Sequence, residues 1–134
     1  AWEGDQDPRT DVLATLEAEA DPGDRIMAPV PGAYNIHGGW SGVVTPMDPL
    51  PVIEETLRLY DVRWLALESA HAVEALRPIL RGEERPRWLS EPLVVTPALP
   101  MTEEELSELA GEEPMPRAAL FAVCLEPGDE RCGA

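Results

Sequence analysis

Both histidines of the chain follow short apolar segments that predict β-strands. His37 comes after residues 25–28, and His71 comes after residues 62–67. In open parallel sheets, ligands bind beyond the carboxyl ends of strands, near the point where the strand order reverses. If the two strands are neighbours, the loops that follow them form one pocket. The residues expected to line this candidate pocket are Gly32, Tyr34, Asn35, His37, Gly38, Trp40, Glu68, Ser69 and His71.

The same residues could support metal or hydrolytic chemistry, but their spacing favours neither. His37 and His71 are 34 residues apart and form no metal-ligand motif with Glu68 or Asp48. Ser69 lies beside Glu68 and His71, yet its segment lacks the glycines of a nucleophile elbow. A serine that caps the following helix explains Ser69 more simply. We therefore predict no catalytic residue, no metal and no cofactor.

Phosphate chemistry is limited by the absence of lysine, since all ten basic residues are arginines. This excludes phosphate-loop, Schiff-base and kinase-type mechanisms. Residues 77–87 contain four arginines but only two acidic residues, Glu83 and Glu84. Such a group is either a solvated helix end or an anion site, because guanidinium groups suit phosphate. The candidate contact for an anion or lipid headgroup is Arg77, Arg81, Arg85 and Arg87.

The net charge of the chain restricts its partners. The 134 residues include 26 acidic and 10 basic ones, which gives −16. Residues 1–24 and 101–134 carry −7 each, whereas residues 25–100 carry only −2. Such a chain repels phosphate backbones, so we expect no nucleic-acid partner. The longest apolar run has eight residues, 118–125, far below the ~18–20 needed to span a bilayer.

Hydrophobic periodicity alternates between helical and extended segments along the chain. Expected helices cover 8–20, 49–60, 70–80 with a kink near Arg77, and 103–110. Expected strands cover 25–28, 42–45, 62–67, 88–95 and 117–125. This order predicts an α/β, three-layer Rossmann-like domain with a mainly parallel central sheet, to which the last two strands could add antiparallel edges. The expected units are a loose segment 1–6, a single domain 7–126 and a tail 127–134.

Local signals set several of these boundaries. Asp7 and Asp48 are expected helix caps because a proline follows each of them. Thr102 and Glu105 form a capping-box pattern at the start of the last helix, with Gly111 as its stop. The tryptophans are expected in the core or at its rim rather than on a sugar-binding platform. They are Trp2, Trp40, Trp64 and Trp88.

The two cysteines leave two alternatives open. Cys124 lies in an apolar run, which favours a buried thiol. A disulfide to Cys132 across the Pro127–Gly128 turn would instead require an oxidising compartment. Fifteen prolines, two side-chain amides and arginine in place of lysine are typical of a thermophilic source, although codon bias explains the arginines equally well. The chain begins Ala-Trp, and we expect it to be a piece of a longer protein.

Three stretches together resemble a known family: residues 24–29, residues 34–46 and residues 60–68, the last reading YDVRWLALE. Their order is similar to that in the C-terminal extracytoplasmic domain of bacterial polytopic membrane glycosyltransferases, of the protein mannosyltransferase and aminoarabinose transferase kind. The likeness covers residues 9–81 and the closing strand. The loop at residues 37–40 is longer than the Thr-Gly-Arg usual in the family. The family's catalytic carboxylates lie in its membrane-proximal part, so none maps onto this chain.

The resemblance implies a non-catalytic accessory domain on the extracytoplasmic face of a bacterial cell membrane. Its expected partners are the transmembrane part of the same parent chain and a lipid-linked sugar or acceptor, whose access the domain would shape. Two alternatives follow from the residues alone. One is a stand-alone small-molecule-binding module that uses the strand-end pocket, and the other is a small hydrolase with Ser69 or a histidine as catalyst.

Overall fold

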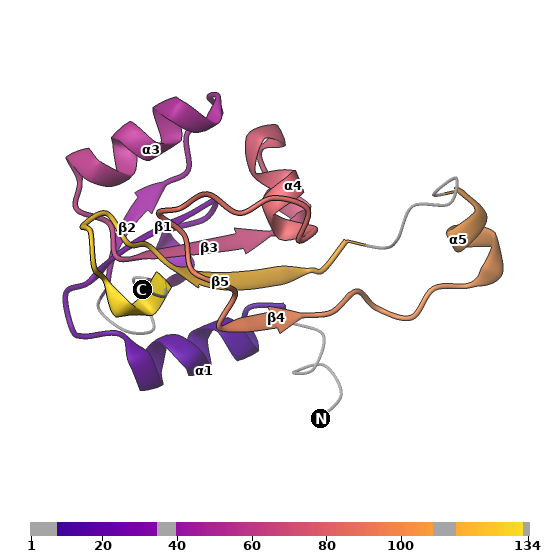
Figure 1. Cartoon of the computed structure of the whole chain (residues 1–134). Helices are drawn as coiled ribbons and strands as arrows, with labels where there is room; N and C mark the ends of the chain where they lie inside the picture. Colours follow the sequence, from indigo (N-terminus) through magenta and orange to yellow (C-terminus); the bar gives the residue numbers. More distant parts are fainter. Residues whose placement is uncertain (1–7, 35–39, 109–114, 133–134) are drawn as a thin grey trace.

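A computed structural model describes residues 8–34, 40–108 and 115–132 (Figure 1). Its strands are β1 Arg25–Ala28, β2 Ser41–Val44, β3 Trp64–Glu68, β4 Val94–Thr96 and β5 Ala118–Ala122. Its helices are α1 Thr10–Glu19, α3 Leu50–Leu59, α4 Arg77–Leu80 and α5 Glu103–Glu108. Short 3₁₀ turns cover Ser69–His71, Glu74–Leu76 and Glu130–Cys132. None of the described helices is long and apolar enough to cross a membrane.

The five strands form one mixed sheet in the order β2-β1-β3-β5-β4. β1 pairs in parallel with both β2 and β3, whereas β5 runs antiparallel to its two neighbours, β3 and β4. The predicted α/β class and the parallel centre are therefore confirmed. The last two strands do add antiparallel pairings on one side, with β4 at the edge and β5 between β4 and β3.

Helices cover both faces of this sheet, which explains why β3 and β5 are buried along their whole length (Figure 1). Side chains of a strand alternate between the two faces. On one face, Ile26 and Trp64 pack with Leu16 of α1. On the other face, Leu65 packs with Leu57 of α3 and with residues of α4. The sheet thus lies between two apolar clusters, one on each of its faces.

The segment after β3 differs from the helix expected over residues 70–80. It consists of two 3₁₀ turns followed by the four-residue helix α4. Pro78 explains the break, because it has no N–H and its ring would clash with the carbonyl four residues earlier in a continuous helix. The helix therefore begins only at Arg77, which places the proline in its first turn. Ser69 lies inside the first 3₁₀ turn and Glu68 is the residue that flanks it, so the capping role expected for Ser69 is wrong.

Two other helix starts differ from expectation by one or two residues. α3 begins at Leu50 with Pro49 as its flanking residue, so Asp48 is not the cap. α1 begins at Thr10, two residues after the expected start. Shifts of this size are within the fraying of helix ends. Three local expectations fall outside the described residues: the cap at Asp7, the stop at Gly111 and the packing of Trp2.

Residues 97–108 form an arm that leaves the sheet after β4 and carries α5 away from the body of the molecule (Figure 1). The predicted capping box is confirmed there. The Thr102 N–H donates to Glu105 Oε1 over 2.9 Å, and the Glu105 N–H donates to Thr102 Oγ1 over 3.1 Å. These bonds hold the pKa of Glu105 below its ordinary value. No residue of α5 is buried.

The two cysteines form a disulfide, so the second of the two alternatives is correct. Cys124 directly follows the last bridge of the sheet, and Cys132 ends the final 3₁₀ turn. Arg131 strengthens this attachment. It donates to the carbonyl of Val123 over 2.7 Å, pairs with Asp129 at 2.9 Å and lies 5.3 Å from the centroid of the Trp64 ring. Residues 127–132 are therefore held against the end of the sheet.

Candidate functional site

The carboxyl ends of β1 and β3 lie side by side, as the candidate pocket requires. They are also the point where the strand order reverses, because the chain moves to β2 on one side and to β5 and β4 on the other. Glu68 ends β3 with only 3% of its surface exposed, and Tyr34 from the segment after β1 is fully buried. The Tyr34 hydroxyl donates a 2.8 Å hydrogen bond to Glu68 Oε2. The structure thus brings together two residues predicted for the pocket.

Arg9, just before α1, completes this group. Its Nη2 lies 2.8 Å from Glu68 Oε1, and its Nε donates to Glu68 Oε2 over 2.9 Å. This two-pronged arrangement is the strong form of an arginine–carboxylate pair. A buried carboxylate is costly unless it is paired and hydrogen-bonded, and here both oxygens have donors. We call Arg9, Glu68 and Tyr34 the carboxylate cluster.

The electrostatics of the carboxylate cluster fix Tyr34 in its neutral form. Burial raises the pKa of Tyr34 well above its ordinary value, and the negative charge of Glu68 and the hydrogen bond to it act in the same direction. Arg9 opposes this effect only in part. Tyr34 therefore serves as a hydrogen-bond donor over the physiological pH range rather than as an acid or base. At the switch point of the sheet, the polar groups of the cluster are therefore engaged with one another.

The other predicted pocket residues do not join the cluster. Trp40 is buried in the α1-side core together with Trp64, and Trp88 lies in the core on the opposite face, so the core assignment of these three is confirmed. Ser69 is half-buried, whereas Gly32 and His71 are exposed. Asn35, His37 and Gly38 lie outside the described residues. In the described part of the chain, no hydrogen bond joins Ser69 to His71.

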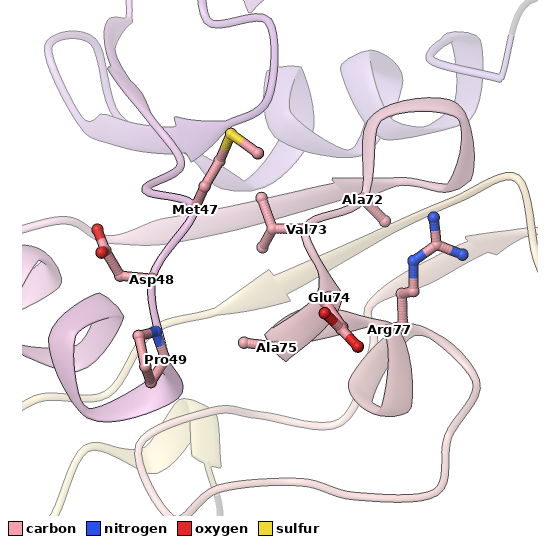
Figure 2. A pocket seen from close by; sticks show the side chains of 8 residues that line it. All are labelled: Met47, Asp48, Pro49, Ala72, Val73, Glu74, Ala75 and Arg77. Carbon is pink, nitrogen blue, oxygen red and sulfur yellow. The ribbon is translucent and has the colours of Figure 1, made fainter.

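An open hollow of about 840 Å³ lies at the same edge of the sheet, between the loop after β2 and the segment after β3 (Figure 2). We call it the β2–β3 hollow. Its lining residues are Met47, Asp48, Pro49, Ala72, Val73, Glu74, Ala75 and Arg77. Figure 2 shows Met47 and Asp48 on one side, with Glu74 and Arg77 on the other. Apolar walls with charges of both signs suit a small hydroxyl-rich or zwitterionic molecule.

Of these lining residues, Asp48 had been considered as a metal ligand and Arg77 as an anion contact, but the pocket itself was predicted at the loops after β1 and β3. The signal that could have found the hollow was Asp48-Pro49 in the loop between a predicted strand and a predicted helix. Arg9 was missed entirely as a site residue. It lies 59 positions from Glu68 and belongs to no motif that links the two.

The four arginines of residues 77–87 are all exposed, but they line three different hollows. Arg77 lines the β2–β3 hollow. Arg81 and Arg85 line a hollow of about 450 Å³ between α4 and strands β4 and β5, which we call the α4 hollow. Arg85 and Arg87 border a groove beside the disulfide. A contact with lipid headgroups remains a prediction for these residues.

Within residues 8–34, 40–108 and 115–132, no group of three or more His, Cys, Asp or Glu side chains could hold a metal ion. No protein-family model, no curated protein and no solved structure matches the chain. The functional argument therefore depends on the geometry just described and on the residues of the sequence.

Proposed function

We propose that this chain is a non-catalytic accessory domain of a glycosyltransferase-like membrane protein, exposed on the extracytoplasmic face of a bacterial membrane. In that setting it shapes the access of the acceptor or of the lipid-linked sugar donor. The carboxylate cluster is the observation that supports a non-catalytic role. The place where an α/β domain of this kind ordinarily binds its ligand is filled by Tyr34 and Glu68, and both carboxylate oxygens are engaged.

Two features support the rest of the proposal. The Cys124–Cys132 disulfide is the bond expected in an oxidising compartment outside the cytoplasm. The membrane setting is motivated by the resemblance of residues 24–29, 34–46 and 60–68 to the extracytoplasmic domain of that family. Helices on both faces of a sheet with a parallel centre further support the finer assignment, a three-layer Rossmann-like plan.

The test begins with the gene that encodes the chain. We expect it to encode several hydrophobic segments of about 20 residues each upstream of this domain. In spheroplasts of cells that express the whole gene product, added protease should then remove the domain without lysis of the membrane. A gene with no such segments, or a domain protected until the membrane is broken, would overturn the proposal.

A second candidate function is a small-molecule-binding module, and the β2–β3 hollow favours it. Its volume lies within the range of ligand pockets, roughly 300–1,000 Å³, and it carries Asp48, Glu74 and Arg77 on apolar walls. A thermal-shift screen with sugars, amino acids and nucleotides tests this function. A true ligand should raise the melting temperature of the wild-type chain and of the control Arg87→Ala, but not that of Arg77→Ala. Unchanged melting temperatures across the whole set would exclude this function.

The third alternative, a small hydrolase, has less support. Glu68 is committed to Arg9 and Tyr34, so it does not orient His71 as a catalytic carboxylate would. We therefore expect no turnover of generic ester or phosphate-ester substrates by the purified chain. A measurable rate that is lost in Ser69→Ala would establish this alternative instead.

A further inference from the structure

The charged side chains of the β2–β3 hollow have no partners within the protein. Asp48, Glu74 and Arg77 line it, and in the described part of the chain no ion pair or side-chain hydrogen bond engages any of them. Glu74 and Arg77 are three residues apart, a spacing that brings opposite charges together in helical turns, yet they form no ion pair. The hollow therefore keeps three charged groups available to a bound molecule.

Met47 adds an apolar group that also lacks internal packing. At 91% exposed, it is the most exposed large apolar side chain among the residues that the structure describes. It lines the hollow together with Val73 and Ala75, which are half-buried and pack against the core. A methionine side chain is flexible and adapts to irregular shapes. A ligand with a short apolar stretch would cover Met47 against these walls.

The hollow lies at the edge of the sheet where α/β domains bind ligands, beyond the carboxyl ends of parallel strands. It is formed by the segments that follow β2 and β3, the two parallel neighbours of β1. Where β1 and β3 themselves end, the polar groups of Tyr34 and Glu68 are engaged with each other. The hollow thus provides, at the same edge, an open cavity whose charged groups are not engaged.

The signs and positions of the three charges indicate the class of ligand. Two acids and one arginine are complemented by two cations and one anion. The planar fork of Arg77 suits a carboxylate, and the carboxylates of Asp48 and Glu74 accept hydrogen bonds from ammonium groups. Figure 2 shows Glu74 and Arg77 on one side of the hollow and Asp48 on the other. One cation and the anion therefore belong at one end of the ligand, and the second cation belongs at its other end.

We propose that the β2–β3 hollow binds a free basic amino acid of the lysine or arginine type. Its α-carboxylate pairs with Arg77 and its α-ammonium group with Glu74. Its side-chain cation reaches Asp48, and its methylene groups lie against Met47 and Val73. The net charge of −16 also attracts a ligand that carries a net positive charge. This inference rests on the second candidate function, the small-molecule-binding module, and names the ligand class of its hollow.

Calorimetric titration of the wild-type chain with L-lysine and L-arginine tests the proposal, and two matched compounds dissect it. Norleucine differs from lysine by lacking the side-chain ammonium group, and cadaverine differs by lacking the carboxylate. Each should bind roughly tenfold more weakly than lysine, because each loses one charge-assisted contact. Norleucine or cadaverine that binds as tightly as lysine would overturn the proposal. So would the absence of binding by both basic amino acids at millimolar concentrations.

Variants assign each charge of the ligand to a side chain. Asp48→Asn should remove the advantage of lysine over norleucine, and Arg77→Gln should remove its advantage over cadaverine, since each compound already lacks the matching contact. The controls Glu55→Gln and Arg87→Gln make the same charge changes at exposed positions outside the hollow and should leave every affinity unchanged. Circular dichroism verifies that all four variants are folded. A lysine affinity that falls no further in Asp48→Asn than in Glu55→Gln would overturn the assignment.

The thermal-shift screen described above separates the failure of this inference from the failure of the binding module. If another compound stabilises the wild-type chain but not Arg77→Ala, and neither basic amino acid binds, the hollow is a binding site and the proposed ligand class is wrong. If no compound stabilises the chain, both the binding module and the ligand class are refuted.

Discussion

The carboxylate cluster predicts an unusual asymmetry between its two charged members. Glu68 is 3% exposed, whereas the Arg9 side chain is 25% exposed. Removing the charge of Arg9 leaves a carboxylate inside the protein with only Tyr34 as donor. Removing the charge of Glu68 leaves a guanidinium that can still turn toward water. Arg9→Gln should therefore destabilise the fold more than Glu68→Gln, although both variants break the same pair.

The magnitudes follow from the burial of the charge that remains. Loss of one partner of a buried ion pair costs about 3–5 kcal/mol, which we expect for Arg9→Gln. For Glu68→Gln we expect about 2–3 kcal/mol, because the remaining cation is partly solvated. In a chain of this length, 1 kcal/mol corresponds to roughly 3–4 °C in melting temperature. The double variant should lose less than the sum of the two single variants, by about 1–3 kcal/mol.

Urea unfolding followed by tryptophan fluorescence provides the assay, since Trp40 and Trp64 are buried in the core next to the cluster. Arg58→Gln is the matched control. It breaks an exposed pair with Glu54 at 3.1 Å and an exposed hydrogen bond to the Leu125 carbonyl. Surface ion pairs contribute at most about 1 kcal/mol. If Arg9→Gln were no more destabilising than Arg58→Gln, the reasoning from burial would be refuted. An equal loss in Arg9→Gln and Glu68→Gln would refute the asymmetry.

Three further predictions concern the pH dependence, the close packing and the disulfide. The pKa of Tyr34 is raised in the folded state, so its contribution to the free energy of unfolding should be fully present below about pH 10 and should fall above it by roughly 1.4 kcal/mol per pH unit. Urea titrations between pH 8 and 11.5 should show this slope in the wild-type chain and not in Tyr34→Phe. Gly42→Ala should lower the free energy of unfolding by about 1–3 kcal/mol, because a Cβ there would lie 2.4 Å from Pro31 Cβ. The control Gly32→Ala, which has nothing within 4 Å, should change it little, and equal losses in urea unfolding would contradict the clash. Reduction of the disulfide, which closes a loop with a sequence separation of 8, should lower the free energy of unfolding by about 2.5 kcal/mol, and equal urea midpoints with and without reductant would contradict this.

The parts of the fold that the sequence predicted well are those encoded by neighbouring residues. Residues 64–67 are all apolar, and such a run is the local pattern of a strand covered on both faces, as β3 is. Thr102 and Glu105 are three residues apart, so their capping box is visible without any tertiary contact. Pro78 indicated a break in its helix. How many residues before it lose the α-helical conformation depends on the packing of Leu76 and Leu80 against the core.

The candidate site was predicted less well because its contacts join distant segments. Tyr34 and Glu68 were correctly placed at neighbouring strand ends, a consequence of parallel pairing. Nothing near Glu68 in the sequence indicated that it would be buried, since its burial depends on Arg9 in a different element. Trp40 was expected both in the candidate pocket and in the core or at its rim. It is only 4% exposed because residues of α1 and β3 pack around it.

The position of β5 has a consequence for synthesis of the chain on the ribosome. β3 pairs with β5 through residues at least 50 positions apart, from Glu68 with Ala118 to Trp64 with Ala122. Until β5 leaves the ribosome, one long edge of β3 has no strand to pair with. Unpaired edges of this kind promote aggregation, and pairings between distant residues fold slowly. We therefore expect the sheet to close only after about residue 122 has emerged, with an edge of β3 exposed until then.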